Sequence, residues 1–170
     1  MEEGPSINAI RFRSWQEAEK ADRAEPGVIW RWPNFTPKEM ADRQSGELVI
    51  VPYFMNWLQG LRTEFGRAMV VTSGYRTSTH QQSIDGRSTG AHVDGMAADI
   101  RIANPFAHDL ARLAFNMGAL GVGVHQDPAT PREERYIHLD LWMRAPTGAR
   151  PALWSYARST SALDALASAA

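Results

Sequence analysis

Residues 95–102, with the sequence GMAADIRI, predict a β-strand whose interior contains a carboxylate. Asp99 stands between Ala98 and Ile100 in a run of small and apolar residues, so we expect its side chain to be buried. A buried carboxylate is costly unless a cation or strong hydrogen-bond donors lie beside it. The chain must therefore fold so that other elements bring such a partner to Asp99.

Three segments carry helix signals. Apolar residues recur at helical spacing over residues 51–65 and again over residues 105–119, so each segment is expected to pack one face on a core. A shorter helix is expected to begin at Thr36, where Pro37 and Glu39 complete a capping box.

Short alternating or β-branched segments predict the strands. Besides residues 95–102, these segments are residues 28–32, 67–75, 120–127 and 134–143. The polar segment over residues 76–90 is rich in turn formers and is expected to be a loop. This order of helices and strands predicts an α+β domain with a small, mostly antiparallel sheet.

The composition is that of an ordinary globular domain. The length of 170 residues predicts a single domain, and the net charge of −1 gives no electrostatic case for binding nucleic acid or an anionic membrane surface. No run of about 18 apolar residues predicts a membrane-spanning helix. The chain has no cysteine, so any metal must be held by His, Asp or Glu, which suits a catalytic zinc site.

Two histidines could provide the partner that Asp99 needs. His92 lies in the loop that feeds the strand, and a turn at the following Asp-Gly pair could fold it back towards Asp99. In the segment YIHLD, strand alternation puts His138 and Asp140 on one face. Two imidazoles and one carboxylate, with a fourth position for water, are the usual composition of a catalytic zinc site. The alternative is a loop histidine and a plain pair of His138 with Asp140, without a metal.

Four motifs, in the order SGYRT, TGAHVDGMAADIRI, GVGVH and YIHLDLW, extend this pattern. Together they resemble the zinc D-Ala-D-Ala carboxypeptidase family, and most closely its phage-type branch, which is common in tailed phages and in bacterial murein peptidases. The resemblance implies the fold of hedgehog proteins and D-Ala-D-Ala peptidases, with helices packed on one side of the sheet. It divides the chain into a lead-in (1–32), a zinc peptidase-like domain (33–156) and an Ala/Ser-rich tail (157–170).

Carried over residue by residue, the resemblance implies that His92, Asp99 and His138 bind Zn²⁺. It implies that Arg76, at the end of the SGYR motif, contacts the substrate near the scissile bond. A guanidinium there can hold a terminal carboxylate or stabilise an oxyanion. His125, which ends the GVGVH motif, is a further candidate for stabilising the tetrahedral intermediate.

The chain departs from many relatives at the general base. They carry an acidic residue three positions before the last histidine ligand, where this chain has Arg135. Asp140 is then the best candidate, because it shares a face with His138. It could activate the zinc water, act as a fourth ligand or orient the histidine. Glu133 and Glu134 are alternatives if the preceding loop folds inwards.

The resemblance implies a zinc metallopeptidase that hydrolyses peptidoglycan stem peptides or cross-links next to a D-amino acid. The enzyme would be a D-Ala-D-Ala carboxypeptidase or a murein endopeptidase, encoded by a phage and used to degrade the cell wall during entry or lysis. The N-terminal sequence MEEGPSINAIRFRSW lacks the basic and apolar regions of a signal peptide. We therefore expect the protein in the virion or in the host periplasm and cell wall, without a signal peptide of its own.

Two other roles stay open. The protein could be a structural component of a virion tail or baseplate that uses the peptidase fold and contacts other virion proteins. It could also be a zinc-bearing binding module without turnover, because the same resemblance includes signalling proteins that keep zinc and do not cleave. The missing acid at Arg135 favours this last role.

Overall fold

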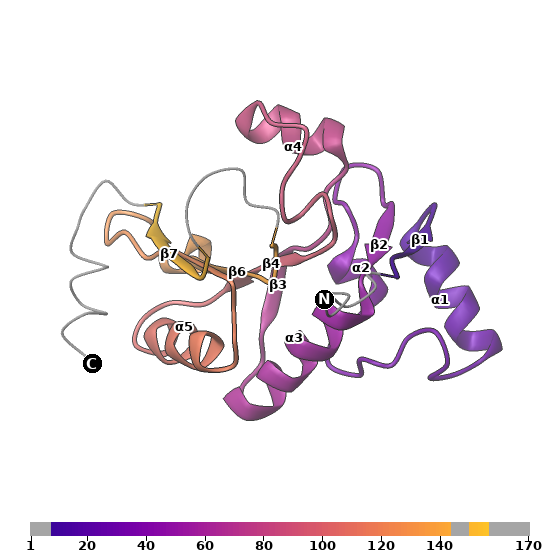
Figure 1. Cartoon of the computed structure of the whole chain (residues 1–170), viewed down its shortest axis with the longest axis horizontal. Coiled ribbons are helices and arrows are strands. Elements are labelled where there is room, and N and C mark those ends of the chain that lie inside the picture. Colours follow the sequence, from indigo (N-terminus) through magenta and orange to yellow (C-terminus); the bar gives the residue numbers. More distant parts are fainter. Residues whose placement is uncertain (1–7, 144–149, 157–170) are drawn as a thin grey trace, which may run out of the picture.

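A five-stranded sheet forms the centre of the computed structural model, which describes residues 8–143 and 150–156 (Figure 1). The strands lie in the order β3–β4–β6–β5–β7. Their bounds are β3 (Val70–Ser73), β4 (Ala97–Arg101), β5 (Gly121–His125), β6 (Tyr136–Asp140) and β7 (Ala152–Ser155). The β5–β7 pairing is parallel and the other three are antiparallel, which confirms the predicted small, mostly antiparallel sheet.

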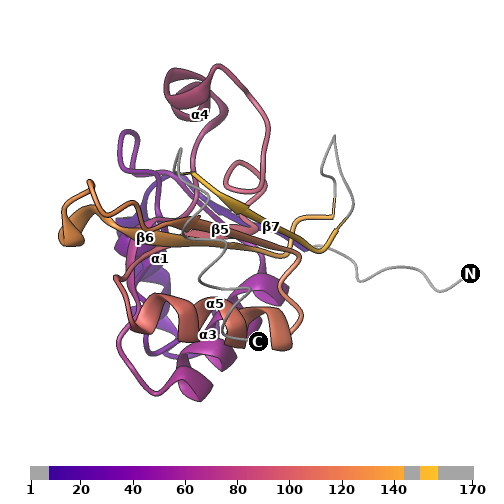
Figure 2. The same cartoon turned by 90° about the vertical axis from the view of Figure 1, so that its left-hand side faces the viewer.

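Two helices, α3 (Pro52–Phe65) and α5 (Phe106–Asn116), cover one face of this sheet (Figure 2). The core lies between them and the sheet, and it includes the fully buried Leu58, Leu110 and Ile137. The opposite face of the sheet carries the buried polar side chains of Asp99 and His138. No helix in the described part of the chain has the length and apolar character needed to cross a bilayer.

The N-terminal part of the chain forms a separate two-stranded antiparallel sheet beside the main one. The sheet consists of β1 (Ile10–Phe12) and β2 (Leu48–Ile50), and the helices α1 (Trp15–Ala24) and α2 (Pro37–Met40) lie between these strands in the sequence. The predicted capping box opens α2, with the Thr36 and Glu39 side chains each bonded to the other's backbone amide. The boundary at residue 32 stays a prediction, and the Ala/Ser-rich tail (157–170) lies outside the described residues.

The strand predicted over residues 28–32 is wrong, because this segment forms no strand and pairs with none of the strands in the described part of the chain. Its alternating tryptophans are instead inserted into the core. Trp30 and Trp32 pack edge to face, with ring centroids 5.3 Å apart. Each indole N–H is bonded, from Trp30 to the carbonyl of Phe35 at 2.8 Å and from Trp32 to the Asn56 side chain at 2.8 Å. Packing of two large rings, rather than strand pairing, explains the alternation.

The segment expected to be only a loop contains a helix, α4 (Ser78–Asp85). The Thr77 side chain accepts a hydrogen bond from the amide of His80 at its start, and Gly86 ends it with a φ of 77°. Gln81 is the buried residue of this helix, so no apolar stripe marks it in the sequence. α4 is an additional helix on the face of the sheet opposite α3 and α5 (Figure 2).

A buried carboxylate fixes the start of α4. Asp42 accepts hydrogen bonds from the amides of Ser45 at 2.8 Å and Thr77 at 2.7 Å, and it lies 2.8 Å from Nδ1 of His80. Burial opposes the ionisation of Asp42, but these hydrogen bonds lower its pKa to about 2. Asp42 thereby ties α4 to the segment between α2 and β2.

Asp42→Asn is expected to lower the free energy of unfolding by about 2 kcal/mol at pH 7. The folded-state pKa of about 2 lies below the ordinary 3.8, so ionised Asp42 stabilises the fold above pH 4, and this contribution is lost as the pH falls through 2. Urea unfolding at pH 7 and at about pH 2.5 measures this contribution. The difference in the free energy of unfolding between wild type and variant should shrink by more than about half at the lower pH. An equal difference at both pH values would contradict this role of Asp42.

Candidate metal centre

One row of side chains crosses the sheet on the face opposite α3 and α5. Asp99 of β4 and His138 of β6 are direct partners in the strand register. Gly123 of β5 lies on the other side of His138, and Trp154 of β7 follows Gly123. Because neighbouring residues of a strand point to opposite faces, the alternation that buries Ile137 in the core turns His138 to this face.

His92 joins this row from the turn before β4. The Gly95 amide donates a hydrogen bond to the carbonyl of His92 at 3.2 Å, and Gly95 has a φ of 68°, in the left-handed region that favours glycine. A Cβ atom at Gly95 would also come within 3.0 Å of the Val49 carbonyl oxygen. The turn predicted at the Asp-Gly pair therefore forms and brings His92 back beside Asp99.

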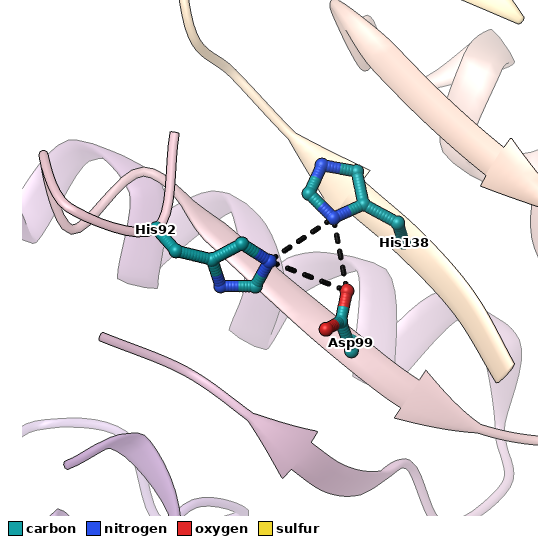
Figure 3. A group of neighbouring side chains, drawn as sticks. All are labelled: His92, Asp99 and His138. Carbon is teal, nitrogen blue, oxygen red and sulfur yellow. Dashed lines mark hydrogen bonds and ion pairs between the residues drawn. The ribbon is translucent and has the colours of Figure 1, made fainter. Parts of the chain in front are cut away.

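Three donor atoms converge at one point (Figure 3). Nε2 of His92 lies 3.2 Å from Nδ1 of His138 and 3.3 Å from Oδ1 of Asp99, and the last two atoms are 2.9 Å apart. Ligands at zinc-bonding distance in a tetrahedral site are separated by about 3.3 Å. The spacing and the chemistry of the three donors therefore fit a zinc ion with a fourth position left open.

Each of the three side chains also has a second polar atom, on the side away from the cluster, that is held by a hydrogen bond. Nδ1 of His92 donates to the Gly74 carbonyl at 2.6 Å, which leaves the lone pair of Nε2 facing the cluster. Nε2 of His138 lies 3.1 Å from Oδ2 of Asp140, and Arg76 donates to Oδ2 of Asp99 at 2.6 Å. Outer hydrogen bonds of this kind fix the tautomer and orientation of metal ligands.

The charges of the cluster favour a cation at the same point. Burial lowers the pKa of His92, so this imidazole is neutral and able to bind a metal. Burial alone would raise the pKa of Asp99, but His92 and His138 hold it well below its usual range. Burial also opposes the charge of His138, yet hydrogen bonds to Asp140 and Asp99 raise the pKa of His138 to about 9. The buried carboxylates of Asp99 and Asp140 thus stabilise positive charge at His138, one of the three donors.

Two glycines of β5 make room for the side chains around the cluster. A Cβ atom at Gly121 would collide with the Asp140 carboxylate and with Arg150, which donates to both oxygens of Asp140 at 3.0 and 3.1 Å. A Cβ atom at Gly123 would come within 2.8 Å of Trp154. The Gly-x-Gly pattern of this strand is therefore required by the close approach of Asp140, Arg150 and Trp154 to its backbone.

The cluster opens into a cavity of about 570 Å³. One wall comes from α4 and the loop after it and includes Ile84 and Arg87. The other wall is aromatic and consists of Tyr136, Trp142, Trp154 and Tyr156. A cavity of this size and mixed lining is typical of a site for a small ligand or a peptide segment.

The structure places two of the predicted catalytic residues differently with respect to this cavity. Arg76 lines it and uses three of its five N–H donors within the protein, on Ser73, Gln81 and Asp99. Two donors are left for a substrate. His125 is not among the described residues that line the cavity, and its ring instead stacks on Tyr136 with centroids 4.8 Å apart.

Arg135, which stands where many relatives carry an acidic residue, is turned away from the metal cluster. The Arg135 side chain donates to the carbonyls of Thr130 at 2.8 Å and Pro128 at 3.0 Å, so it fixes the preceding loop. Glu133 and Glu134 are exposed in the short 3₁₀-helix η1 (Arg132–Glu134). Within the described part of the chain, the carboxylates that line the cavity are those of Asp85, Asp99 and Asp140.

Sequence reasoning gave no role to several residues that form the site. Arg150 holds Asp140, and Gln81 joins Arg76 to Asp85 through its amide group. Neither residue belongs to a motif singled out in the sequence, so no local pattern marks its role. Tyr136 does have one, since it stands two residues before His138 on the same face of β6.

A family model of known proteins matches the chain. The family model described as Peptidase M15 matches residues 33–140, which is more than half of the chain and contains His92, Asp99 and His138. No curated protein sequence matches the chain.

Proposed function

Because the chain belongs to the Peptidase M15 family, we propose that it is a zinc metallopeptidase that hydrolyses peptidoglycan stem peptides, or the cross-links between them, next to a D-amino acid. The observation that carries the proposal is the convergence of Nε2 of His92, Oδ1 of Asp99 and Nδ1 of His138 at the floor of a cavity. Three protein donors with a fourth position open to the cavity are the arrangement of a catalytic zinc site rather than a structural one.

Zinc held by these residues would lower the pKa of a bound water to about 7 and polarise the scissile carbonyl group. Asp99 presents Oδ1 to the centre because Arg76 holds its other oxygen, and Arg76 keeps two N–H donors for the substrate. We assign Asp140 the task of orienting His138. Its two oxygens are occupied by His138, Arg150 and the amide of Trp142.

Digestion of purified peptidoglycan, followed by mass spectrometry of the released fragments, tests the proposed activity. We expect the chain to release a terminal Ala or to convert cross-linked dimers to monomers. We expect this activity to disappear with a zinc chelator and to return on addition of zinc. Unchanged peptidoglycan with the zinc-loaded protein would contradict the proposed function, and the fragment masses would identify the bond that is cut.

We also propose that a phage encodes this activity and uses it to open the cell wall during entry or lysis, and the resemblance of the motifs to the phage-type branch supports this proposal. A protein carried in the virion should co-purify with particles, whereas a free lytic enzyme should stay in the lysate supernatant. Either result would locate the protein, and its absence from both fractions of an infected culture would contradict a phage role.

A second candidate function is zinc binding without turnover. The observation that favours it is Arg135, which replaces the acidic residue of many relatives and faces away from the cavity. This function predicts one tightly bound zinc ion per chain and no release of fragments from any wall peptide. Cleavage by the wild-type chain excludes it.

A further inference from the structure

The cavity beside the metal cluster contains a tyrosine on the same strand as a proposed ligand. Tyr136 is the first residue of β6, and it lies two residues before His138, on the face that carries His138. Its direct partner in β4 is Arg101, two residues beyond Asp99. Tyr136 lines the cavity together with His92, Asp99 and His138. Its ring therefore lies two residues along β6 from His138, whose Nδ1 is one of the three converging donors.

Two neighbouring rings hold Tyr136 in place. His125 of β5 stacks on it almost in parallel, with ring centroids 4.8 Å apart and an angle of 5° between the planes. Tyr156, the residue after β7, packs against it at 5.6 Å and 48°. A side chain that is already fixed before substrate binds loses little conformational freedom when it makes a new hydrogen bond.

The hydroxyl of Tyr136 has the properties of a hydrogen-bond donor to substrate. Within residues 8–143 and 150–156, Gln126 contacts the main-chain oxygen of Tyr136, and the hydroxyl has no protein partner. An ordinary phenol has a pKa of about 10. The phenol therefore keeps its proton throughout the neutral range.

We propose that Tyr136 is a further catalytic residue, whose hydroxyl donates a hydrogen bond to the oxyanion that forms when water attacks the scissile carbonyl. In that step a water that has released one proton to bulk solvent bonds through its oxygen to the carbonyl carbon, and the π electron pair of the C=O bond moves onto the carbonyl oxygen. Tyr136 donates to this oxygen without transferring its proton. The proposal rests on the proposed peptidase function, and it assigns His125 the role of a positioning residue beneath the Tyr136 ring.

Tyr136→Phe, which removes only the hydroxyl, tests this proposal. We expect kcat for peptidoglycan fragments to fall by about 10²-fold, because loss of one oxyanion donor has effects of about 10²–10³-fold. KM and the amount of bound zinc should stay close to wild type. A phosphinate analogue of D-Ala-D-Ala, whose tetrahedral phosphorus resembles the intermediate, should bind more weakly by a similar factor. The matched control is Tyr53→Phe on α3, where the side chain is exposed and remote from the cavity.

Two results would overturn the proposal while leaving the peptidase function intact. In the first, wild type and Tyr136→Phe cleave at the same rate. In the second, the variant is slow only because it has lost zinc. If wild type itself binds zinc but cleaves nothing, the proposed function fails and this proposal fails with it.

His125→Phe distinguishes Tyr136 from His125 as the donor. The substitution keeps a flat ring beneath Tyr136 and removes both ring nitrogens of His125. If His125 only positions Tyr136, the loss of kcat should be at least about tenfold smaller than the loss caused by Tyr136→Phe. An equal or larger loss would assign the hydrogen bond to His125 and overturn the proposal.

Discussion

His138→Ala is expected to lower zinc affinity by about 10³-fold and to abolish hydrolysis. Nδ1 of His138 is one of three converging donor atoms, so its removal takes away about a third of a binding free energy that is about 10–16 kcal/mol in structural zinc sites. It also leaves Asp99 and Asp140 without the imidazole that lies between them. Zinc titration followed by calorimetry, with a digest of peptidoglycan on the same samples, measures both effects.

His108→Ala is the matched control for this experiment. His108 lies on α5, which covers the face of the sheet opposite the metal cluster (Figure 2). This variant should bind zinc and cleave as wild type does, so a general effect of removing a histidine can be separated from loss of a ligand. Normal zinc binding by His138→Ala would show that the metal is held elsewhere.

Asp140→Asn is expected to lower zinc affinity by about 10–100-fold while leaving all three donor side chains in place. Asp140 accepts from Nε2 of His138 at 3.1 Å and so fixes the nitrogen that faces the cluster. Substitution of such outer partners typically has effects of this size on metal affinity. The neutral amide would also leave the largely buried Arg150 without its charged partner. Competition with a chelator of known affinity measures the change.

The same variant separates two of the roles considered for Asp140, those of general base and of orienting residue. A general base would lose kcat and keep zinc affinity, whereas an orienting residue loses affinity first. Asp109→Asn is the control, because Asp109 is an exposed carboxylate on α5 that pairs with Arg112. Wild-type zinc affinity in Asp140→Asn, with a large loss of kcat, would contradict the orienting role.

The sequence predicts most of the central sheet because its strands carry local signals. The alternation of YIHLD puts His138 on one face and Ile137 on the other, and the structure shows this arrangement. The helix α4 could not be predicted in this way. It has no apolar stripe, and it is held by Asp42, a residue on a distant segment whose position depends on the whole fold.

The three candidate metal ligands could also be predicted from local sequence signals, but the residues that surround them could not. His92 and Asp99 lie on one short segment, and the turn between them is set by Gly95. Arg150 and Gln81 act on the site through side-chain contacts with Asp140 and Arg76 that no motif or periodicity of the sequence indicates. Which nitrogen of His138 faces the cluster is likewise decided by its bond to Asp140.

Anomalous diffraction at the zinc edge, from crystals of the zinc-loaded chain, tests the metal centre most directly. We predict one peak per chain, about 2.0–2.1 Å from Nε2 of His92, from Oδ1 of Asp99 and from Nδ1 of His138. The peak should be absent in crystals of His92→Ala grown under the same conditions. A zinc peak bound through other residues, or no peak in zinc-loaded wild-type crystals, would contradict the assignment of this cluster as the catalytic site.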